Sequence, residues 1–318
     1  MTRLKHKLMN LLLGASILAA ASGAQSCAVM RAFSLENKDS RISADSLAAE
    51  LKPEGKLLEM EYECSVGGAS RRRMIVYLPK SYNLPENASR RYPVLYLLHG
   101  ARGNESSWCT NASITSIADE LWDENLAAEC IIVMPNMNQY DNDEQGETSM
   151  FKKPFESLFD MDGSTDSGFI HDVVEFTDRN FRTLASKKYR GIAGLSIGAM
   201  QALYISANFP DSFSEIGLFS PLYKNYITHS EHSDIYNNLV QKQKIQFQDP
   251  PRTYNIYIGN YDFFIDHMYW YRQYLYVNGF HYKFIRTGGG HDWRNWKSYI
   301  RMFMQEIFPD CNQASIGE

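Results

Sequence analysis

The sequence predicts an α/β fold, with a mostly parallel central sheet, antiparallel strands at its start and helices on both faces. From residue 93 onward, short apolar runs typical of buried strands alternate with segments of helical periodicity. Before that point, two strand-like segments flank the polar turn 67–71, which is typical of an antiparallel hairpin. The chain has 318 residues, 44% of them apolar, which is enough for one large core or two small ones.

Each element follows from its own local pattern. Runs rich in β-branched and aromatic residues, bounded by turn residues, indicate strands, and apolar residues three and four apart indicate helices. The expected strands are 58–66, 74–78, 93–98, 130–134, 192–193, 215–219, 254–258 and 281–285. The expected helices are 113–125, 169–181, 197–209, 235–244, 264–277 and 296–308.

The first residues have the pattern of an export signal. Arg3, Lys5 and Lys7 precede the apolar stretch 8–21, and small residues before Gln25 suit cleavage, so we expect a signal peptide over 1–24. Alternatives are an acylated Cys27, which would attach the protein to a membrane, and an uncleaved anchor. We expect an exported protein, either periplasmic or secreted.

The rest of the chain divides simply. Residues 25–54 are polar and indicate a linker or an N-terminal arm. Residues 55–310 are expected to form one catalytic domain, with a polar and aromatic insertion over 136–167 and a tail over 311–318.

Charge and residue spacing give no reason to expect a nucleic-acid partner or a metal. The formal net charge of −5 gives no reason to expect a nucleic-acid partner. No cysteine pair has C-x-x-C spacing, and the acidic residues near position 141 lack the spacing of a calcium loop, so we expect no metal. Disulfide pairing stays open among Cys64, Cys109, Cys130 and Cys311, with buried free thiols as the alternative.

The motif Gly194-x-Ser196-x-Gly198 lies between an apolar run and a helical pattern. A strand, a sharp turn and a helix would expose the Ser196 hydroxyl at the end of a sheet. The backbone N–H of Ile197, which begins the helix, would then point to where an oxyanion forms. The alternative is an ordinary turn with a serine helix cap.

A second glycine-rich turn follows the apolar run 93–98. Backbone N–H groups at such a turn can point toward a ligand, and we expect Ala101 to supply the second oxyanion donor. We expect His99 to brace this loop and not to act as a base.

A serine nucleophile requires a base and an acid that orients the base. Asp262 and His291 each follow a predicted strand, in the order serine, acid, histidine. Asp266 is the rival acid, one turn into the next helix. His267 and His281 fall inside predicted elements, where we expect structural or surface roles.

Together these motifs resemble the putative-esterase branch of the α/β-hydrolases, which includes carbohydrate esterase family 1. The matching stretches are 73–79, 92–100 with Gly103 and Trp108, 192–198, 259–262, and 289–293 with Trp296. The resemblance implies Ser196 as nucleophile, Asp262 as acid, His291 as base, and Ala101 and Ile197 as oxyanion donors, with no cofactor. Ala199 departs from the family, whose members usually have glycine there.

The resemblance implies an exported serine esterase that removes feruloyl or acetyl groups from plant polysaccharide or its fragments. The alternatives are a thioesterase like S-formylglutathione hydrolase, a siderophore esterase, and a noncatalytic carbohydrate-binding protein on the same scaffold. An acylated carbohydrate or another small ester is the expected partner. Trp108, Trp293 and the aromatic residues of the insertion are candidates for stacking on the substrate, with core packing as the alternative for the tryptophans.

Overall fold

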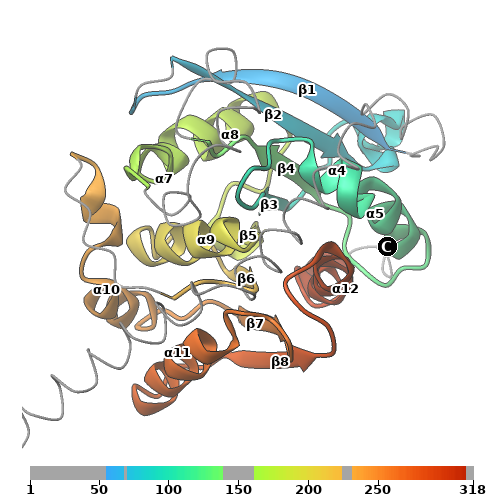
Figure 1. Ribbon diagram of the computed structural model, residues 1–318. Helices are drawn as coiled ribbons and strands as arrows, with labels where there is room; N and C mark the ends of the chain where they lie inside the picture. Colours follow the sequence, from blue (N-terminus) through green and yellow to red (C-terminus); the bar gives the residue numbers. More distant parts are fainter. Residues whose placement is uncertain (1–54, 68–69, 139–160, 224–230, 313–318) are drawn as a thin grey trace, which may run out of the picture. The chain divides into compact units, whose positions relative to one another are not determined.

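One eight-stranded sheet organises the residues described by the computed structural model, which are 55–67, 70–138, 161–223 and 231–312. The order of the strands is β1-β2-β4-β3-β5-β6-β7-β8. β1, β2 and β4 pair antiparallel and the remaining neighbours pair parallel, which confirms the predicted α/β fold (Figure 1). The strands are β1 (Lys56–Glu63), β2 (Arg71–Leu78), β3 (Val94–Leu98), β4 (Ile131–Pro135), β5 (Arg190–Leu195), β6 (Glu215–Phe219), β7 (Thr253–Gly259) and β8 (Lys283–Thr287).

Helices cover both faces of this sheet. Helices α4, α5 and α12 lie on one face, and α7 to α11 lie on the other (Figure 1). The α-helices are α4 (Ser107–Ala112), α5 (Ile114–Asp123), α7 (Ser164–Phe169), α8 (Glu175–Asn180), α9 (Ile197–Asn208), α10 (Leu239–Gln246), α11 (Ile265–Val277), α12 (Trp293–Met304) and α13 (Pro309–Asn312). Shorter turns are η1 (Lys80–Asn83), η2 (Pro85–Asn87), the π-turn η4 (Ile170–Val174), η5 (Lys187–Tyr189) and η6 (Ser233–Tyr236).

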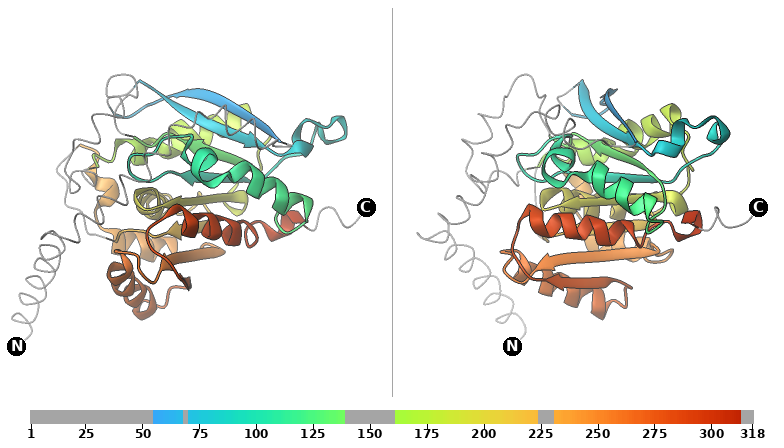
Figure 2. Two further views of the ribbon diagram at one scale, coloured as in Figure 1. Left: turned by 45° about the vertical axis from the view of Figure 1, so that its right-hand side comes forward. Right: turned by 90° about the vertical axis from the view of Figure 1, so that its right-hand side faces the viewer.

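Strand β3 shows why its apolar run is continuous. Val94, Tyr96 and Leu98 pack under α7, α9 and their neighbours, whereas Leu95 and Leu97 pack under α4, α5 and α12. Successive side chains of a strand point to opposite faces, so a strand covered on both faces must be apolar at every position. All five are completely buried. Strand β3 lies inside the sheet, whose edges are the hairpin β1–β2 on one side and β8 on the other (Figure 2).

Several helix boundaries differ from the prediction. The expected helix 113–125 is preceded by α4, and Ser113 in the left-handed conformation (φ 54°) separates α4 from α5. The expected helix 169–181 begins earlier, at Ser164, and contains the π-turn, so the end of the predicted insertion is helical. Helix α12 starts at Trp293 because the side chain of Asp292 caps it, accepting a hydrogen bond from the backbone N–H of Asn295.

Asp166 is a completely buried carboxylate in α7. The side-chain amide of Gln201 donates to its Oδ1 at 2.9 Å, and the hydroxyl of Tyr236 donates to its Oδ2 at 2.7 Å. These hydrogen bonds join α7 to η6 and to α9, the helix that follows Ser196.

The predicted signal peptide, linker and Cys27 lie outside the described residues, as does most of the tail. Among the residues that are described, no helix has the length and apolar character needed to cross a membrane.

Candidate active site

Ser196 lies at a sharp turn between β5 and α9. Its backbone has φ 54° and ψ −116°, a strained conformation for a residue with a side chain. The Ser196 N–H donates to the carbonyl of Phe219 at 2.9 Å, which ties the turn to the end of β6. This is the strand–turn–helix geometry that exposes a nucleophile at the end of a sheet.

The two glycines of the motif are required by close packing. A Cβ on Gly194 would lie 2.5 Å from the backbone of Gly198, and a Cβ on Gly198 would lie 2.3 Å from the carbonyl oxygen of His99. Both contacts are with backbone atoms that cannot move aside. The glycines therefore allow α9 to start directly beneath the end of β3. Ala199, next to Gly198, is accommodated with its methyl group completely buried.

The structure brings Ser196, His291 and Asp262 together from the loops after β5, β8 and β7. His291 Nε2 lies 2.9 Å from Ser196 Oγ, and His291 Nδ1 lies 3.0 Å from Asp262 Oδ2. The carboxylate can only accept from Nδ1–H, which leaves Nε2 to accept the serine proton. Asp266, the rival acid, lies exposed in the first turn of α11.

Asp262 is held in its ionised form although it is buried. Burial alone would raise the pKa of its carboxyl, but the charge and hydrogen bond of His291 and a hydrogen bond from the Phe264 N–H together lower it below the ordinary value. A carboxylate that stays charged can orient the imidazole and stabilise its cationic form.

The loop after β3 places Ala101, the second predicted oxyanion donor. The carbonyl of Gly100 accepts hydrogen bonds from His99 Nδ1 at 2.8 Å and from the Gly103 N–H at 3.1 Å. Because a trans peptide holds its C=O and N–H in opposite directions, fixing the Gly100 carbonyl also fixes the direction of the Ala101 N–H. Ile197, the other predicted donor, is the first residue of α9, where backbone N–H groups lack partners within the helix.

His99 is a structural brace, as predicted. Its Nε2 accepts from the Met137 N–H at 2.9 Å, so Nδ1 carries the proton that is donated to Gly100. Burial lowers the pKa of His99, which keeps the ring in this neutral form. Both ring nitrogens are occupied, so His99 has no capacity to serve Ser196 as a base.

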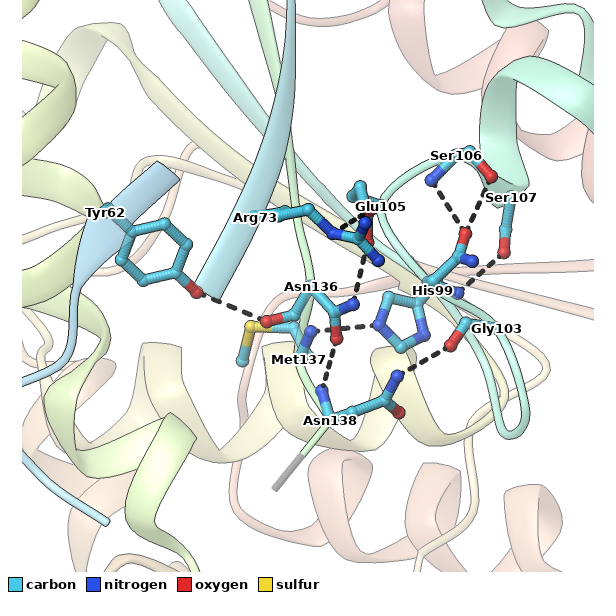
Figure 3. Close-up of polar contacts among 11 residues, drawn as sticks. Tyr62, Arg73, His99, Gly103, Glu105, Ser106, Ser107, Asn136, Met137 and Asn138 are labelled. Atoms are coloured by element: carbon cyan, nitrogen blue, oxygen red, sulfur yellow. Dashed lines mark hydrogen bonds and ion pairs between the residues drawn. The ribbon is translucent and has the colours of Figure 1, made fainter. Parts of the chain in front are cut away.

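Further polar contacts hold this loop against the end of β4 (Figure 3). Glu105 accepts from the side-chain amide of Asn136 at 2.7 Å and pairs with Arg73 of β2 at 3.1 Å. The side-chain amide of Asn138 donates to the Gly103 carbonyl at 2.9 Å. The loop is thus fixed from two neighbouring strands, which gives its N–H groups a set direction before any substrate binds.

A family model described as Putative esterase matches residues 68–304, which is more than half of the chain. The chain belongs to this esterase family. The match spans the serine motif, the loop after β3, Asp262 and His291.

Known proteins similar to this esterase include enzymes that act on feruloyl esters. It is 34% identical over 146 residues to an endo-1,4-beta-xylanase/feruloyl esterase of Xylanibacter ruminicola; the match covers 46% of this chain but only 19% of that longer protein. The ferulic acid esterase of Anaeromyces mucronatus has the same fold, with a TM-score of 0.62 and 22% identity over 80% of this chain and 91% of that one. S-formylglutathione hydrolase of Staphylococcus aureus also shares it, with a TM-score of 0.60 and 17% identity over 79% of this chain and 95% of that one.

The esterase site includes Ser220, which sequence reasoning missed. Its hydroxyl lies near enough to Asp262 to help lower the pKa of that carboxyl, and it accepts from the indole N–H of Trp296 at 3.2 Å. The Trp296 ring in turn packs edge-to-face on His291, with ring centroids 5.0 Å apart. Ser220 directly follows β6 with φ 52°, so a serine just past a buried strand was the available signal.

We expect Ser220→Ala to lower kcat for p-nitrophenyl acetate about tenfold, or about 1.4 kcal/mol, because the hydroxyl helps to keep Asp262 ionised and an ionised Asp262 stabilises the His291 cation. KM should change little, since the hydroxyl acts on Asp262 and not on the substrate. Ser206→Ala is the matched control: Ser206 is equally buried in α9, where its hydroxyl donates only to the Leu203 carbonyl among its described contacts. Equal kcat values in the two variants would contradict a positioning role.

The structure corrects the prediction for Trp108. Its side chain is completely buried, its indole N–H donates to the Leu98 carbonyl at 3.0 Å, and its ring packs against Phe219 and Trp293. Trp108 therefore has no surface to offer a substrate. Trp293, at the start of α12, is partly exposed.

Other predictions lie partly outside the described residues. The aromatic residues expected to border the site, Tyr140, Phe151, Phe155 and Phe159, belong to the part of the insertion that is not described, so their contact with substrate stays a prediction. Among the described residues, Cys109, Cys130 and Cys311 carry free thiols, and the sulfur of Cys64 accepts a hydrogen bond from Arg72 at 3.0 Å. In the described ranges, no cluster of histidine, cysteine and acidic side chains is arranged to hold a metal ion.

Proposed function

We propose that this protein is an exported serine carboxylic-ester hydrolase that removes feruloyl or acetyl groups from plant polysaccharide or its oligosaccharides. The observation that carries the proposal is the hydrogen-bonded line from Ser196 Oγ to His291 and on to Asp262, at 2.9 Å and 3.0 Å. Membership of the esterase family and similarity to feruloyl esterases support the reaction class and the acyl group.

In the first half-reaction, Ser196 Oγ attacks the ester carbonyl while His291 Nε2 takes the hydroxyl proton. Asp262 stabilises the imidazolium that forms. The N–H groups of Ala101 and Ile197 bind the negative oxygen of the tetrahedral intermediate. As the intermediate collapses, His291 returns the proton to the departing alcohol and the acyl group stays on Ser196.

In the second half-reaction, water takes the place of the alcohol. His291 removes a proton from the water, which attacks the acyl-serine carbonyl, and the same two N–H groups bind the new oxyanion. The proton then passes from His291 to Ser196 Oγ, which frees the carboxylic acid. Apart from the ester and water, every group used in these steps is a side chain or a backbone N–H of the chain.

The proposal is tested with a panel of substrates: p-nitrophenyl acetate, methyl ferulate, acetylated xylan, a catechol siderophore ester and S-formylglutathione. We expect turnover of p-nitrophenyl acetate and the highest kcat/KM with methyl ferulate or acetylated xylan. A preference for the siderophore ester would reassign the substrate. No turnover of any member would favour a noncatalytic carbohydrate-binding protein.

The second candidate is a thioesterase of the S-formylglutathione hydrolase type. The fold shared with the staphylococcal enzyme favours it. The basic and apolar pattern of residues 1–24 opposes it, since glutathione thioesters are intracellular. A higher kcat/KM for S-formylglutathione than for methyl ferulate would replace the first proposal with this one.

Export is part of the same proposal and rests on the sequence of residues 1–24. The mature chain is expected to begin near Gln25, or at an acylated Cys27. The intact mass of protein from the native host distinguishes these forms, and an unprocessed Met1 would exclude both.

A further inference from the structure

Two aromatic side chains flank Asp262 at the surface of the molecule. Tyr261 is 84% exposed and Phe263 is 38% exposed, whereas Asp262 between them is buried. The Tyr261 N–H donates to the Gly289 carbonyl at 2.9 Å, which bonds its backbone to the loop carrying His291. The Phe263 ring lies against the imidazole of His291, with centroids 4.3 Å apart. Both residues therefore border the histidine side of the site.

The acyl part and the alcohol part of a bound ester lie on different sides of the site. In the proposed reaction, His291 Nε2 gives its proton to the oxygen of the departing alcohol, so that oxygen must lie within hydrogen-bond reach of Nε2. The acyl group is attached to the carbonyl carbon that Ser196 attacks. Side chains next to His291 are thus placed to contact the alcohol part of the ester.

Exposed aromatic side chains are concentrated in the segment that begins at Tyr261. Of the large apolar side chains that are exposed in the described residues, most lie between positions 261 and 277: Tyr261, Phe263, Tyr269, Trp270, Tyr276 and Val277. The Tyr261 ring is too exposed to contribute to the core, and its backbone is bonded to the loop that carries His291; exposed aromatic rings that border a site are typical of ligand contacts. The C–H face of a sugar is apolar and flat enough to pack on a ring.

We propose that Tyr261, with Phe263, forms a subsite for the sugar that carries the ester, in which the Tyr261 ring stacks on the sugar face. This inference rests on the proposed function, because it assigns the alcohol of that reaction. It places sugar recognition on the loop between β7 and α11, apart from the predicted insertion at 136–167.

The experiment compares a substrate that has the sugar with one that lacks it. Feruloylated arabino-oligosaccharide and methyl ferulate share the acyl group, and acetylated xylo-oligosaccharide and methyl acetate are the equivalent pair for an acetyl esterase. We expect Tyr261→Ala to raise KM about fivefold to tenfold for the sugar ester. KM for the methyl ester and kcat for both should stay within twofold of wild type. Tyr261→Phe should keep the wild-type KM because the ring is retained.

The matched control is Tyr276→Ala, which removes a tyrosine that is 72% exposed near the far end of α11. It should leave KM unchanged for both substrates. An equal loss on both esters in Tyr261→Ala, or no change on either, would overturn the subsite. If the wild-type protein hydrolyses neither the feruloyl esters nor the acetyl esters, the proposed function has failed, and the subsite fails with it. The wild-type assay shows this before any variant is made.

Discussion

Ser196→Ala is expected to lower kcat for p-nitrophenyl acetate by about 10⁵-fold or more, because the variant lacks the oxygen that attacks the carbonyl. His291 and Asp262 would remain hydrogen-bonded at 3.0 Å but would have no proton to accept from residue 196. Background hydrolysis would persist through the oxyanion donors alone.

The same variant should unfold at nearly the wild-type temperature. The tight turn at Ser196 depends on backbone hydrogen bonds and on the neighbouring glycines, which alanine does not alter. Activity and thermal unfolding are therefore measured on the same preparation. Turnover above a hundredth of the wild-type rate would rule out Ser196 as the nucleophile, provided that the variant is folded.

Asp262→Asn is expected to lower kcat by about 10⁴-fold, because an amide facing His291 Nδ1 favours the wrong tautomer of the imidazole. The hydrogen bond from the Phe264 N–H to the side-chain oxygen can be kept, so the loop should retain its conformation. The expected result is a loss of rate with little loss of stability.

Asp266→Asn provides the control for this charge change. Asp266 is exposed in the first turn of α11, four residues from Asp262, and makes no described contact with His291. Its kcat should stay within about twofold of wild type, since surface substitutions away from a site have small effects. A larger loss in Asp266→Asn than in Asp262→Asn would move the acid to position 266.

Local patterns were sufficient to predict the sheet and the three residues that the structure brings together. The run at β3 is apolar at every position because both faces are covered, and this is visible without knowing what covers them. Ser196, Asp262 and His291 each follow a strand, and the ends of parallel strands meet at one edge of a sheet. Their places after predicted strands and their order along the chain were therefore enough to bring them together.

What could not be predicted depends on contacts between distant segments. Ser220 lies 42 positions before Asp262 in the sequence, and its place just past a buried strand does not by itself indicate which carboxyl it affects. Trp108 matches the aromatic residues that line binding sites, but the neighbouring Phe219 and Trp293 enclose it completely. The break at Ser113 requires a left-handed residue that is not a glycine, which sequence rules place only rarely.

Asp166, buried between α7, α9 and η6, couples folding to the uptake of a proton. Burial raises the pKa of its carboxyl from the ordinary 3.8 to about 6, although hydrogen bonds from Tyr236 and Gln201 lower it in part. The unfolded chain keeps the ordinary value, so folding at a pH between the two binds a proton. The stability gained is complete below the unfolded pKa and is lost as the pH rises through about 6, a change of about 3 kcal/mol.

The contribution of Asp262 to stability changes with pH in the opposite direction. Its pKa is lowered by folding, so its contribution to stability is present above the unfolded pKa and is lost as the pH falls through the folded value. Together the two carboxyls favour mildly acidic solution, where Asp166 is protonated while Asp262 is still ionised. Buried His99 acts in the other direction, because folding lowers its pKa and stability is therefore lost as the pH falls through the ordinary histidine value of 6.5. Thermal unfolding measured against pH should show the contribution of Asp166 as a loss of stability when the pH rises through about 6, a loss that Asp166→Asn removes.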